Sequence, residues 1–412
     1  MAYISYWFLS PGLFLAILGK LKGQDRTRPT PDFDWRAATV DVAIPARDEE
    51  NSIALALASL FRQDFPTRKV TVIDDGSSDR TAEVVRRYGQ LSGHPVELVA
   101  HQEPAGKTPS IRERCQASDA DALLILDADT VLTDANYVSR SIEELFKNAG
   151  TASVCGEVTP LTRRCRRMLA QADPVVSAVQ AEFGLAAEGR PSRLQALLEY
   201  FTVIYRSTLY VYLQRFVYDG QMKLFGSRLS PIGCAVAYRN NRLRECFDFA
   251  GPRMGDNLSN SEDIFIGHFF AWKGYRNVQV MGVRCASIEP PVGRLPAQLY
   301  LWSSSFLQAT HYFRDLPLSP FKKLWNRARG LLGARQKRPP SKDDRRRIQE
   351  QYRAPWGETY TKRFGRHIGL LDLASMIEKI TYPLILFFLM IFNPKLALFT
   401  RPTRERGGDP RA

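Results

Sequence analysis

The sequence lacks the cysteine spacings that mark a zinc site or a disulfide framework. Its six cysteines are scattered along 412 residues, and no Cys-x-x-Cys pair occurs. This spacing predicts reduced thiols of the kind found in cytosolic proteins. No internal repeat is visible either, which argues against a repeat architecture.

Uninterrupted hydrophobic runs of bilayer length are also lacking. Residues 3–19 are uncharged, but as a helix they would span about 26 Å, less than the roughly 30 Å hydrocarbon core, and Pro11-Gly12 would kink them. Residues 380–399 are interrupted by Asn393-Pro394-Lys395. Each stretch is expected to span the membrane or to lie in its interface, with a buried core helix as the alternative. Basic residues after the first stretch argue against a cleaved signal peptide and predict a cytoplasmic domain.

Positive charge is abundant. The chain has 57 Lys and Arg against 43 Asp and Glu, a net charge of +14, which favours anionic partners such as lipid headgroups, sugar nucleotides or nucleic acid. Residues 321–347 alone contain eleven Lys and Arg and two Asp, which predicts a basic segment drawn to anionic lipid, or else a solvated tail. No aromatic-basic module supports nucleic-acid binding, so we expect none.

Apolar and amphipathic segments alternate through the first third of the chain. Runs at 39–44, 69–73, 96–99 and 122–126 predict strands, and the stretches 50–61, 79–88, 107–117 and 136–147 predict helices. This alternation predicts an α/β fold with a largely parallel sheet and helices on both faces. Ligands of such sheets bind beyond the carboxyl ends of the strands, and acidic residues gather at three of those ends here.

The middle of the chain differs in composition from the first third. Four arginines between 163 and 167 precede amphipathic stretches, and aromatic residues are interleaved with arginines over 198–218. Helical spacing of this kind predicts a helix at a membrane surface or between domains, or an ordinary core helix.

Two acidic pairs are candidates for chemistry. Asp127 and Asp129 close a predicted strand, and carboxylates one residue apart can hold a divalent cation that bridges a pyrophosphate. Glu262 and Asp263 open a predicted helix, where the helix dipole favours acids in any case. Taken alone, both pairs are also common in ordinary loops and helix ends.

Eight motifs occur in an order that resembles glycosyltransferase family 2. They are VAIPARDEEN (42–51), VIDDGSSD (72–79), GK (106–107), LDADT (126–130), SPIGCAVAYR (230–239), SEDIFIG (261–267), GYR (274–276) and EPP (289–291). The similarity covers most of residues 39–305 and is greatest to the membrane-associated branch that includes chitin, hyaluronan and cellulose synthases. It implies the nucleotide-sugar-binding GT-A fold and a hexosyltransferase-type enzyme.

The resemblance implies which residues bind the donor. Ala46, Asp48 and Glu49 match the loop that borders the nucleotide base. Asp75 matches the carboxylate that accepts hydrogen bonds from uracil or its ribose, so Asp74 is expected to act as a turn residue that faces the backbone of Gly76 and Ser77.

The resemblance also implies the catalytic groups. Lys107 matches a basic residue near the diphosphate, Asp127 would lie nearer the donor sugar, and Asp129 would bind Mg²⁺ or Mn²⁺ directly. Asp263 matches the general base of an inverting transfer, with Glu262 on the acceptor side.

One motif departs from the family pattern. The synthase branch carries Gln-x-x-Arg-Trp, whereas here Gln298 and Trp302 enclose Leu301 at the arginine position. Trp302 is still expected to stack on an acceptor sugar, and Arg294 or a residue of the basic segment would have to replace the missing charge. This departure puts processive polymerisation in doubt.

These expectations define one organisation: an N-terminal hydrophobic anchor (1–23), a GT-A domain (36–310) with inserted amphipathic helices (160–225), a basic segment (311–366) and C-terminal hydrophobic helices (367–400). With at most two imperfect spanning segments, a self-contained export channel is not expected. We expect a membrane-associated, metal-dependent inverting enzyme that moves a sugar from a UDP-sugar to a glycan or lipid-linked acceptor, alone or beside a partner membrane protein. The alternative is a catalytically silent relative that serves as an assembly subunit.

Overall fold

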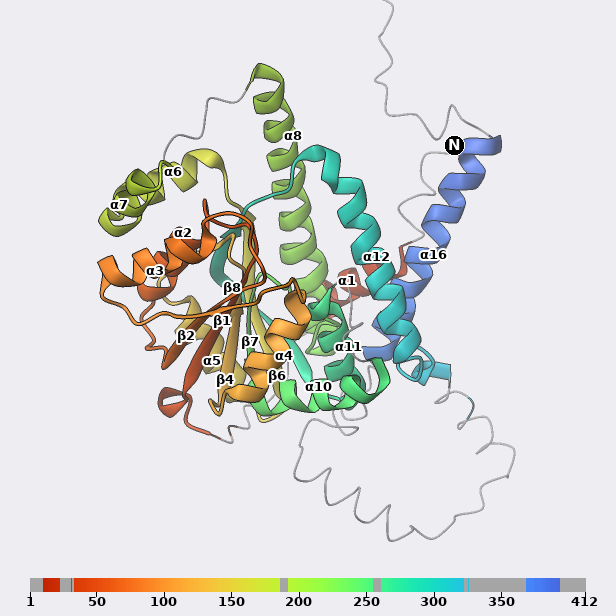
Figure 1. Cartoon of the computed structure of the whole chain (residues 1–412). Helices are drawn as coiled ribbons and strands as arrows, with labels where there is room; N and C mark the ends of the chain where they lie inside the picture. Colours follow the sequence, from red (N-terminus) through yellow and green to blue (C-terminus); the bar gives the residue numbers. More distant parts are fainter. Residues whose placement is uncertain are drawn as a thin grey trace, which may run out of the picture.

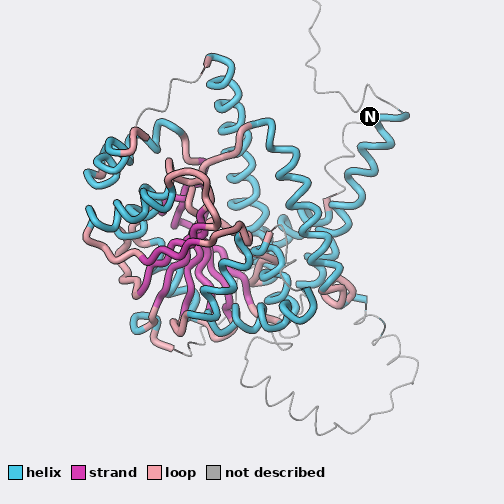
Figure 2. The backbone as a smooth tube through the Cα atoms, viewed as in Figure 1, coloured by secondary structure: helices cyan, strands magenta, loops and turns pink. Residues whose placement is uncertain are grey.

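The protein is built around a mixed sheet with helices on both faces (Figures 1 and 2). The computed structural model describes residues 10–22, 31, 33–185, 192–254, 261–321, 325 and 368–392. In this part of the chain the sheet has eight strands in the order β3-β2-β1-β4-β7-β6-β8-β5. The predicted α/β class, with a GT-A type of arrangement, is confirmed.

The first half of the sheet is parallel, as predicted. Its strands are β1 (Val40–Ala46), β2 (Lys69–Asp74), β3 (Glu97–Ala100) and β4 (Ala122–Leu126). The connecting helices are α2 (Ile53–Phe61), α3 (Thr81–Ser92) and α4 (Lys107–Ala117), and α5 (Tyr137–Lys147) follows β4 and β5. The central strands β1 and β4 are buried almost throughout, which explains their continuous apolar runs.

The second half of the sheet mixes directions. Strand β7 (Ala235–Arg239) is antiparallel to β4 and to β6 (Thr151–Pro160), β8 (Arg276–Ser287) is parallel to β6, and β5 (Thr130–Leu132) is antiparallel to β8. The alternation of apolar and amphipathic segments does not predict these strand pairings, because they join segments far apart in the chain.

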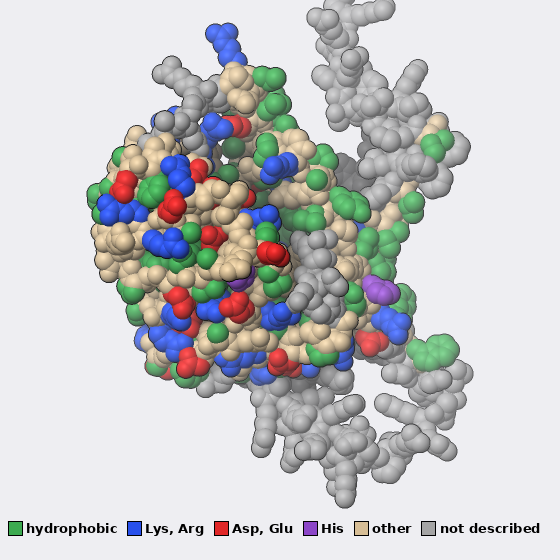
Figure 3. Space-filling model, in the orientation of Figure 1, with side chains coloured by type: hydrophobic (Ala, Val, Ile, Leu, Met, Phe, Trp, Pro, Cys, Tyr) green, Lys and Arg blue, Asp and Glu red, His purple; other side chains and the backbone are tan. Residues whose placement is uncertain are grey.

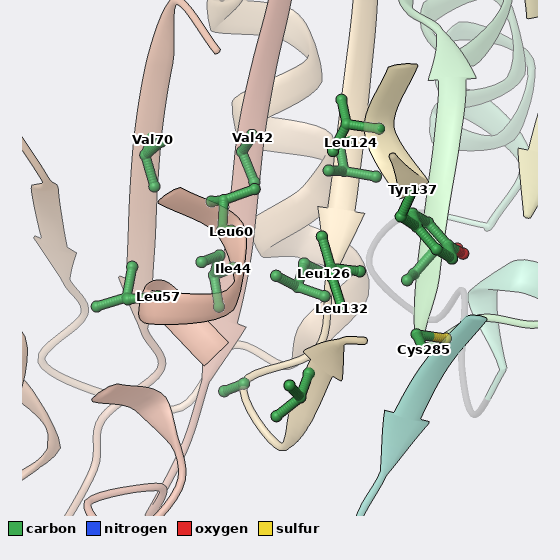
Figure 4. Packing of buried hydrophobic residues seen from close by; sticks show 14 of the residues in the cluster. Val42, Ile44, Leu57, Leu60, Val70, Leu124, Leu126, Leu132, Tyr137 and Cys285 are labelled. Carbon is green, nitrogen blue, oxygen red and sulfur yellow. The ribbon is translucent and has the colours of Figure 1, made fainter. Parts of the chain in front are cut away.

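Two apolar layers cover the faces of the sheet. Helices α2, α3 and α5 pack on one face, where Ile44, Leu60 and Leu124 belong to one apolar cluster (Figure 4). Helices α4, α10 (Asn240–Met254) and α11 (Glu262–Lys273) pack on the other, around Phe265 and Phe269. Helix α11 is thereby fixed with its first turn at the rim where β4 ends.

Helices fill most of the segment between β6 and β7. They are α6 (Arg163–Ala172), α7 (Pro174–Glu182), α8 (Arg193–Tyr210), the π-helical stretch η3 (Val211–Tyr218) and α9 (Asp219–Phe225). Helix α7 contacts α2 and α3, whereas α8 presents exposed Leu194, Tyr200 and Phe201 to its outer side. Helix α8 therefore carries large apolar side chains on its exposed surface, and the amphipathic character expected of residues 160–225 stays a prediction.

A third group of helices lies beside the sheet domain. It comprises α1 (Pro11–Lys22), α12 (Leu295–Tyr312) and α16 (Ile368–Phe392), which share a small apolar cluster with α9 and α11 (Figure 1). Two short 3-10 helices, η2 (Trp35–Ala37) and η4 (Val292–Arg294), complete the described elements.

The two apolar ends of the chain are described in part. Helix α1 begins at Pro11, so the expected kink at Pro11-Gly12 is a helix start, and Gly19 packs against the backbone of Gly220 in α9. Residues 3–9, 393–399 and most of the basic segment lie outside the described residues. Across the described ranges, no helix is both long and apolar enough to cross a membrane.

Candidate active site

The loops that follow β1 and β2 are joined by hydrogen bonds. The Ser77 amide donates to Asp74 Oδ1 at 3.0 Å, and Gly76 takes a left-handed φ of 69° that favours glycine. The predicted turn role of Asp74 is thus seen, with Ser77 as the donor. The Asp75 amide donates to the Ala46 carbonyl, which ties the two strand ends together.

Asp48 and Glu49 face different surroundings. Asp48 Oδ1 accepts from the Ser78 amide at 2.7 Å and from its hydroxyl at 2.9 Å, and these bonds lower the pKa of Asp48. Glu49 accepts from the Ser52 hydroxyl, and burial, with a further contribution from Asp127, raises the pKa of Glu49. Asp48 therefore holds the two loops together, while Glu49 lies near Asp127 and Asp129 at the end of β4.

The Asp75 carboxylate accepts hydrogen bonds on both oxygens. The Ala105 amide donates to Oδ1 and the Gly106 amide to Oδ2, each at 2.8 Å, and His101 Nδ1 lies 3.1 Å from Oδ1. Burial alone would raise the pKa of Asp75, but His101 and the two amides outweigh it and hold the pKa below its ordinary value. Asp75 is therefore an ionised acceptor, held in place by the loop that leads directly into Lys107.

Lys107 is the centre of the acidic cluster. Its Nζ lies 2.7 Å from Asp127 Oδ1 and 2.7 Å from Glu262 Oε1, so it joins the end of β4 to the first turn of α11. Burial alone would lower the pKa of the ammonium, but Asp127 and Glu262 raise it well above its ordinary value. The two motifs are thus brought together across 135 residues of chain.

The pKa values of Asp127 and Asp129 are both raised above the ordinary value of an aspartate. Burial raises the pKa of Asp127 to about 7, with Lys107 opposing the shift. Burial, assisted by Glu49, raises the pKa of Asp129 to about 6. Asp129 Oδ1 accepts from the Thr130 hydroxyl at 3.1 Å and lies 3.5 Å from Ser287 Oγ at the end of β8.

Asp263 completes the cluster from the first turn of α11. Its Oδ1 accepts from the Ile264 amide at 2.9 Å, and burial together with the Glu262 charge raises the pKa of Asp263 to about 7. Gly233 lies against it, because a Cβ there would stand 2.8 Å from Asp263 Oδ2. Any larger residue at 233 would have to displace this carboxylate.

The donor atoms at the end of β4 fit a divalent cation. Asp127 and Asp129 supply hard carboxylate oxygens one residue apart, and a cation would stabilise the charged forms that burial disfavours. Within the described ranges, no group of three or more His, Cys, Asp or Glu stands as a complete metal site.

Gln298 and Trp302 lie on α12. Arg206 of α8 reaches them: its Nη2 donates to Gln298 Oε1, and its guanidinium carbon lies 5.1 Å from the centre of the Trp302 ring. An arginine from another helix thus accompanies this motif, in which Leu301 replaces the family arginine. Arg294, the substitute considered from the sequence, is exposed on η4.

The sequence alone did not identify Arg206, Glu289 or His101 as site residues. Arg206 was hidden among the aromatic residues of 198–218, and Glu289 belongs to the EPP motif but carried no expected role. The signal available for Arg206 was a charged residue within an otherwise apolar helical stretch. Nothing in the sequence marked His101.

The fold and the acidic rim define a nucleotide-sugar-binding class of α/β protein, and comparisons with known proteins agree. The family model described as Glycosyl transferase family 2 matches residues 41–170. A mannosyltransferase from Pyrobaculum calidifontis, solved in complex with GDP-Man and Mn²⁺, superposes with a TM-score of 0.50 at 17% identity and covers 90% of this chain and 95% of its own.

Curated relatives agree on the family. Protein RfbJ of Shigella flexneri is 31% identical over 114 residues, which are 28% of this chain and 81% of RfbJ. A poly-beta-1,6-N-acetyl-D-glucosamine synthase of Staphylococcus epidermidis is 29% identical over 151 residues, and the match spans 37% of this chain and 35% of that synthase. The chain belongs to glycosyltransferase family 2, and its enzyme class is that of the glycosyltransferases.

Proposed function

We propose that the protein is a membrane-associated inverting glycosyltransferase that moves a sugar from a nucleotide sugar, with UDP-sugars as the first candidates, to a hydroxyl of a glycan or lipid-linked acceptor. The observation that carries the proposal is the convergence of Asp127, Asp129, Glu262 and Asp263 around Lys107. These residues come from two distant parts of the chain and meet at the carboxyl end of β4, where ligands of α/β sheets bind.

Asp263 is suited to act as the general base. Its pKa of about 7 lies near the pH at which a base is most effective, and the absence of a side chain at Gly233 leaves the space that its carboxylate occupies. In the proposed reaction the acceptor oxygen forms a bond to the anomeric carbon while the bond from that carbon to the diphosphate oxygen breaks. The acceptor proton moves to Asp263, and the nucleoside diphosphate leaves on the opposite face.

Asp129 would hold Mg²⁺ or Mn²⁺, with Asp127 beside it and nearer the donor sugar. When bound, the cation would stabilise the negative charge of the departing diphosphate. Lys107 places a further positive charge among these carboxylates, in keeping with the expected role near the diphosphate. The Mn²⁺ in the Pyrobaculum mannosyltransferase supports the same kind of cation for this chain.

The donor base is assigned to the loops after β1 and β2. Asp75 is held ionised, and Ala46 and Glu49 border the same rim. Since the Asp75 oxygens already accept from Ala105 and Gly106, a base or ribose would either share this carboxylate or take the place of that loop.

Membrane association is supported by the surface of the outer helices. On α8 the side chains of Leu194, Tyr200 and Phe201 are 65%, 61% and 57% exposed, and Tyr300 of α12 is 76% exposed. Hydrophobic atoms are visible at the free end of α8 in Figure 3. An apolar helix face next to basic residues favours the interface of an anionic bilayer, which would place the site near a lipid-linked acceptor on the cytoplasmic side.

Release of nucleoside diphosphate from a panel of nucleotide sugars tests the proposal. Purified full-length protein with Mn²⁺ is expected to hydrolyse at least one donor, and Asp263→Asn is expected to lower the transfer rate. Turnover with no donor would favour the catalytically silent assembly subunit instead, whereas equal turnover by Asp263→Asn would remove Asp263 from the role of general base. Flotation with vesicles that contain anionic lipid would test membrane association separately, and failure of the protein to float with them would contradict it.

A further inference from the structure

The carboxylate assigned to the donor base is covered by the protein itself. The amides of Ala105 and Gly106 donate to the two oxygens of Asp75, each at 2.8 Å, and His101 Nδ1 lies 3.1 Å from Oδ1. The Asp75 side chain is only 7% exposed. A backbone amide is the same kind of donor as the N–H of a nucleobase, so a base can bind this carboxylate only after the two amides move away.

The next residue along the chain, Lys107, takes up the cation side of the same site. Its Nζ lies 2.7 Å from Asp127 Oδ1 and 2.7 Å from Glu262 Oε1. An ammonium in this position neutralises carboxylate oxygens that a divalent cation would otherwise attract, and it repels that cation. Lys107 therefore opposes the binding of a cation at Asp127 and Asp129.

The segment that makes these contacts lies at the surface. Residues 102–105 are exposed, and a Cβ on Gly76 would stand 3.2 Å from Pro104, so the segment packs directly on the turn after β2. Gly106, at the start of α4, has a φ of 98°, a left-handed conformation that favours glycine. An exposed segment that joins its helix through a glycine can move without disturbing the core of the sheet domain.

We propose that residues 104–107 form an autoinhibitory segment. It occupies Asp75 and Asp127, and a nucleotide and a divalent cation displace it when they bind, so that Lys107 leaves these carboxylates for the diphosphate. The inference rests on the proposed function, because it states what the donor must displace at the same site. Since one segment covers both sites, binding of either ligand favours binding of the other.

Hydrogen exchange of the wild-type, full-length protein tests the displacement. UDP and GDP are added separately with Mg²⁺, and calorimetry shows which of them binds. A bound nucleotide ordinarily slows exchange where it binds, as expected here for residues 46–49. The amides of Ala105 and Gly106 should instead exchange about tenfold or more faster, because they lose Asp75 as their acceptor. Slower or unchanged exchange at 105–106 with the nucleotide bound would overturn the inference and leave the proposed function standing.

Binding of Mn²⁺ without nucleotide tests the role of Lys107. Lys107→Met removes the opposing ammonium, so the affinity for Mn²⁺, measured by electron paramagnetic resonance, should rise by about tenfold or more. Lys69→Met is the matched control, because Lys69 also pairs with an acid, Glu97 at 3.0 Å, but lies at the other end of β2 from Asp74. Its affinity for Mn²⁺ should equal that of the wild type. Equal or weaker Mn²⁺ binding by folded Lys107→Met would overturn the inference.

Thermal melting shows whether Lys107→Met folds, and if it does not, the exchange measurement on the wild type decides. If the wild type released no nucleoside diphosphate from any donor, but a nucleotide accelerated exchange at 105–106 and Lys107→Met bound Mn²⁺ more tightly, the autoinhibitory segment would stand and the proposed function would fall. If neither UDP nor GDP bound, the donor site and the segment that covers it would fall together.

Discussion

Two sets of carboxylates at one rim of the sheet experience opposite electrostatics. Asp75 receives two backbone amides and His101, and its pKa is lowered. Asp127, Asp129 and Asp263 are desolvated and repel other acids, and their pKa values rise to about 7, 6 and 7. Lys107, directly after the loop that holds Asp75, marks the boundary between the two sets.

Under the proposed function, this contrast gives the same residue type two different tasks. A carboxylate held by fixed amides keeps its charge at any physiological pH and suits hydrogen-bonding to a ligand. Carboxylates with pKa values near neutrality exchange protons or recruit a cation, which suits catalysis. In that proposal the environment of each carboxylate, rather than the residue type, separates binding from chemistry.

The largest effect is expected from Asp263→Asn. An amide cannot take the acceptor proton, so the transfer rate should fall by about 100- to 10,000-fold with little change in donor affinity. Glu83→Gln is the matched control, since Glu83 also lies in the first turn of a helix but is exposed and remote. A fall of less than tenfold, measured by product release, would remove Asp263 from the base role.

Asp129→Asn should have the next largest effect. The loss of a direct cation ligand is expected to lower turnover by about 100-fold and to weaken calorimetric binding of Mn²⁺ together with UDP. Asp248→Asn, at an exposed position of α10, should change neither quantity. Full activity of the wild type in excess chelator would show that the reaction needs no cation.

Asp75→Asn should act on the donor rather than on the chemical step. The variant loses the negative charge that accepts hydrogen bonds from the ligand and from the loop amides. The KM for the nucleotide sugar should therefore rise by about tenfold, while kcat changes less. Glu113→Gln, which alters His101 from its other side, should have a smaller effect. An unchanged KM with a reduced kcat would show that Asp75 acts in the chemical step rather than in donor binding.

Asp263→Asn and Asp75→Asn should change the free energy of unfolding in opposite directions, each by about 1 kcal/mol. A raised pKa in the folded protein means that the Asp263 contribution is lost as pH rises through about 7, so Asp263→Asn should stabilise the apo protein at pH 8. The lowered pKa of Asp75 gives stability that is present above about pH 4, so Asp75→Asn should destabilise it there. Urea unfolding at pH 8 measures both changes, and shifts of the same sign would contradict the contrast.

The parallel half of the fold could be predicted because its signals are local. The strands at 39–44, 69–73, 96–99 and 122–126 are each found within two residues of their predicted ends, and the helix 107–117 agrees at both ends. The acidic residues at the strand ends follow from the same alternation. Their convergence is a property of any parallel sheet.

The remaining pairings depend on contacts that sequence patterns do not encode. Strand β7 joins β4 across more than a hundred residues, and Arg206 meets Glu289 only because α8 and the end of β8 pack together. The different protonation of Asp75 and Asp127 also needs the loop geometry, since both residues simply follow apolar strands in the sequence. The spanning or interfacial character of the chain ends and the domain boundaries stay predictions.

Proton release on binding Mn²⁺ and UDP tests the contrast between the two sets most directly. Calorimetry in buffers of different ionisation enthalpy should show about one or more protons released per protein at pH 6 and fewer at pH 8, because a cation must displace protons from Asp127 and Asp129. The release should vanish in the Asp127→Asn/Asp129→Asn double variant and persist in Asp75→Asn. No release at pH 6, or equal loss in Asp75→Asn, would contradict the account.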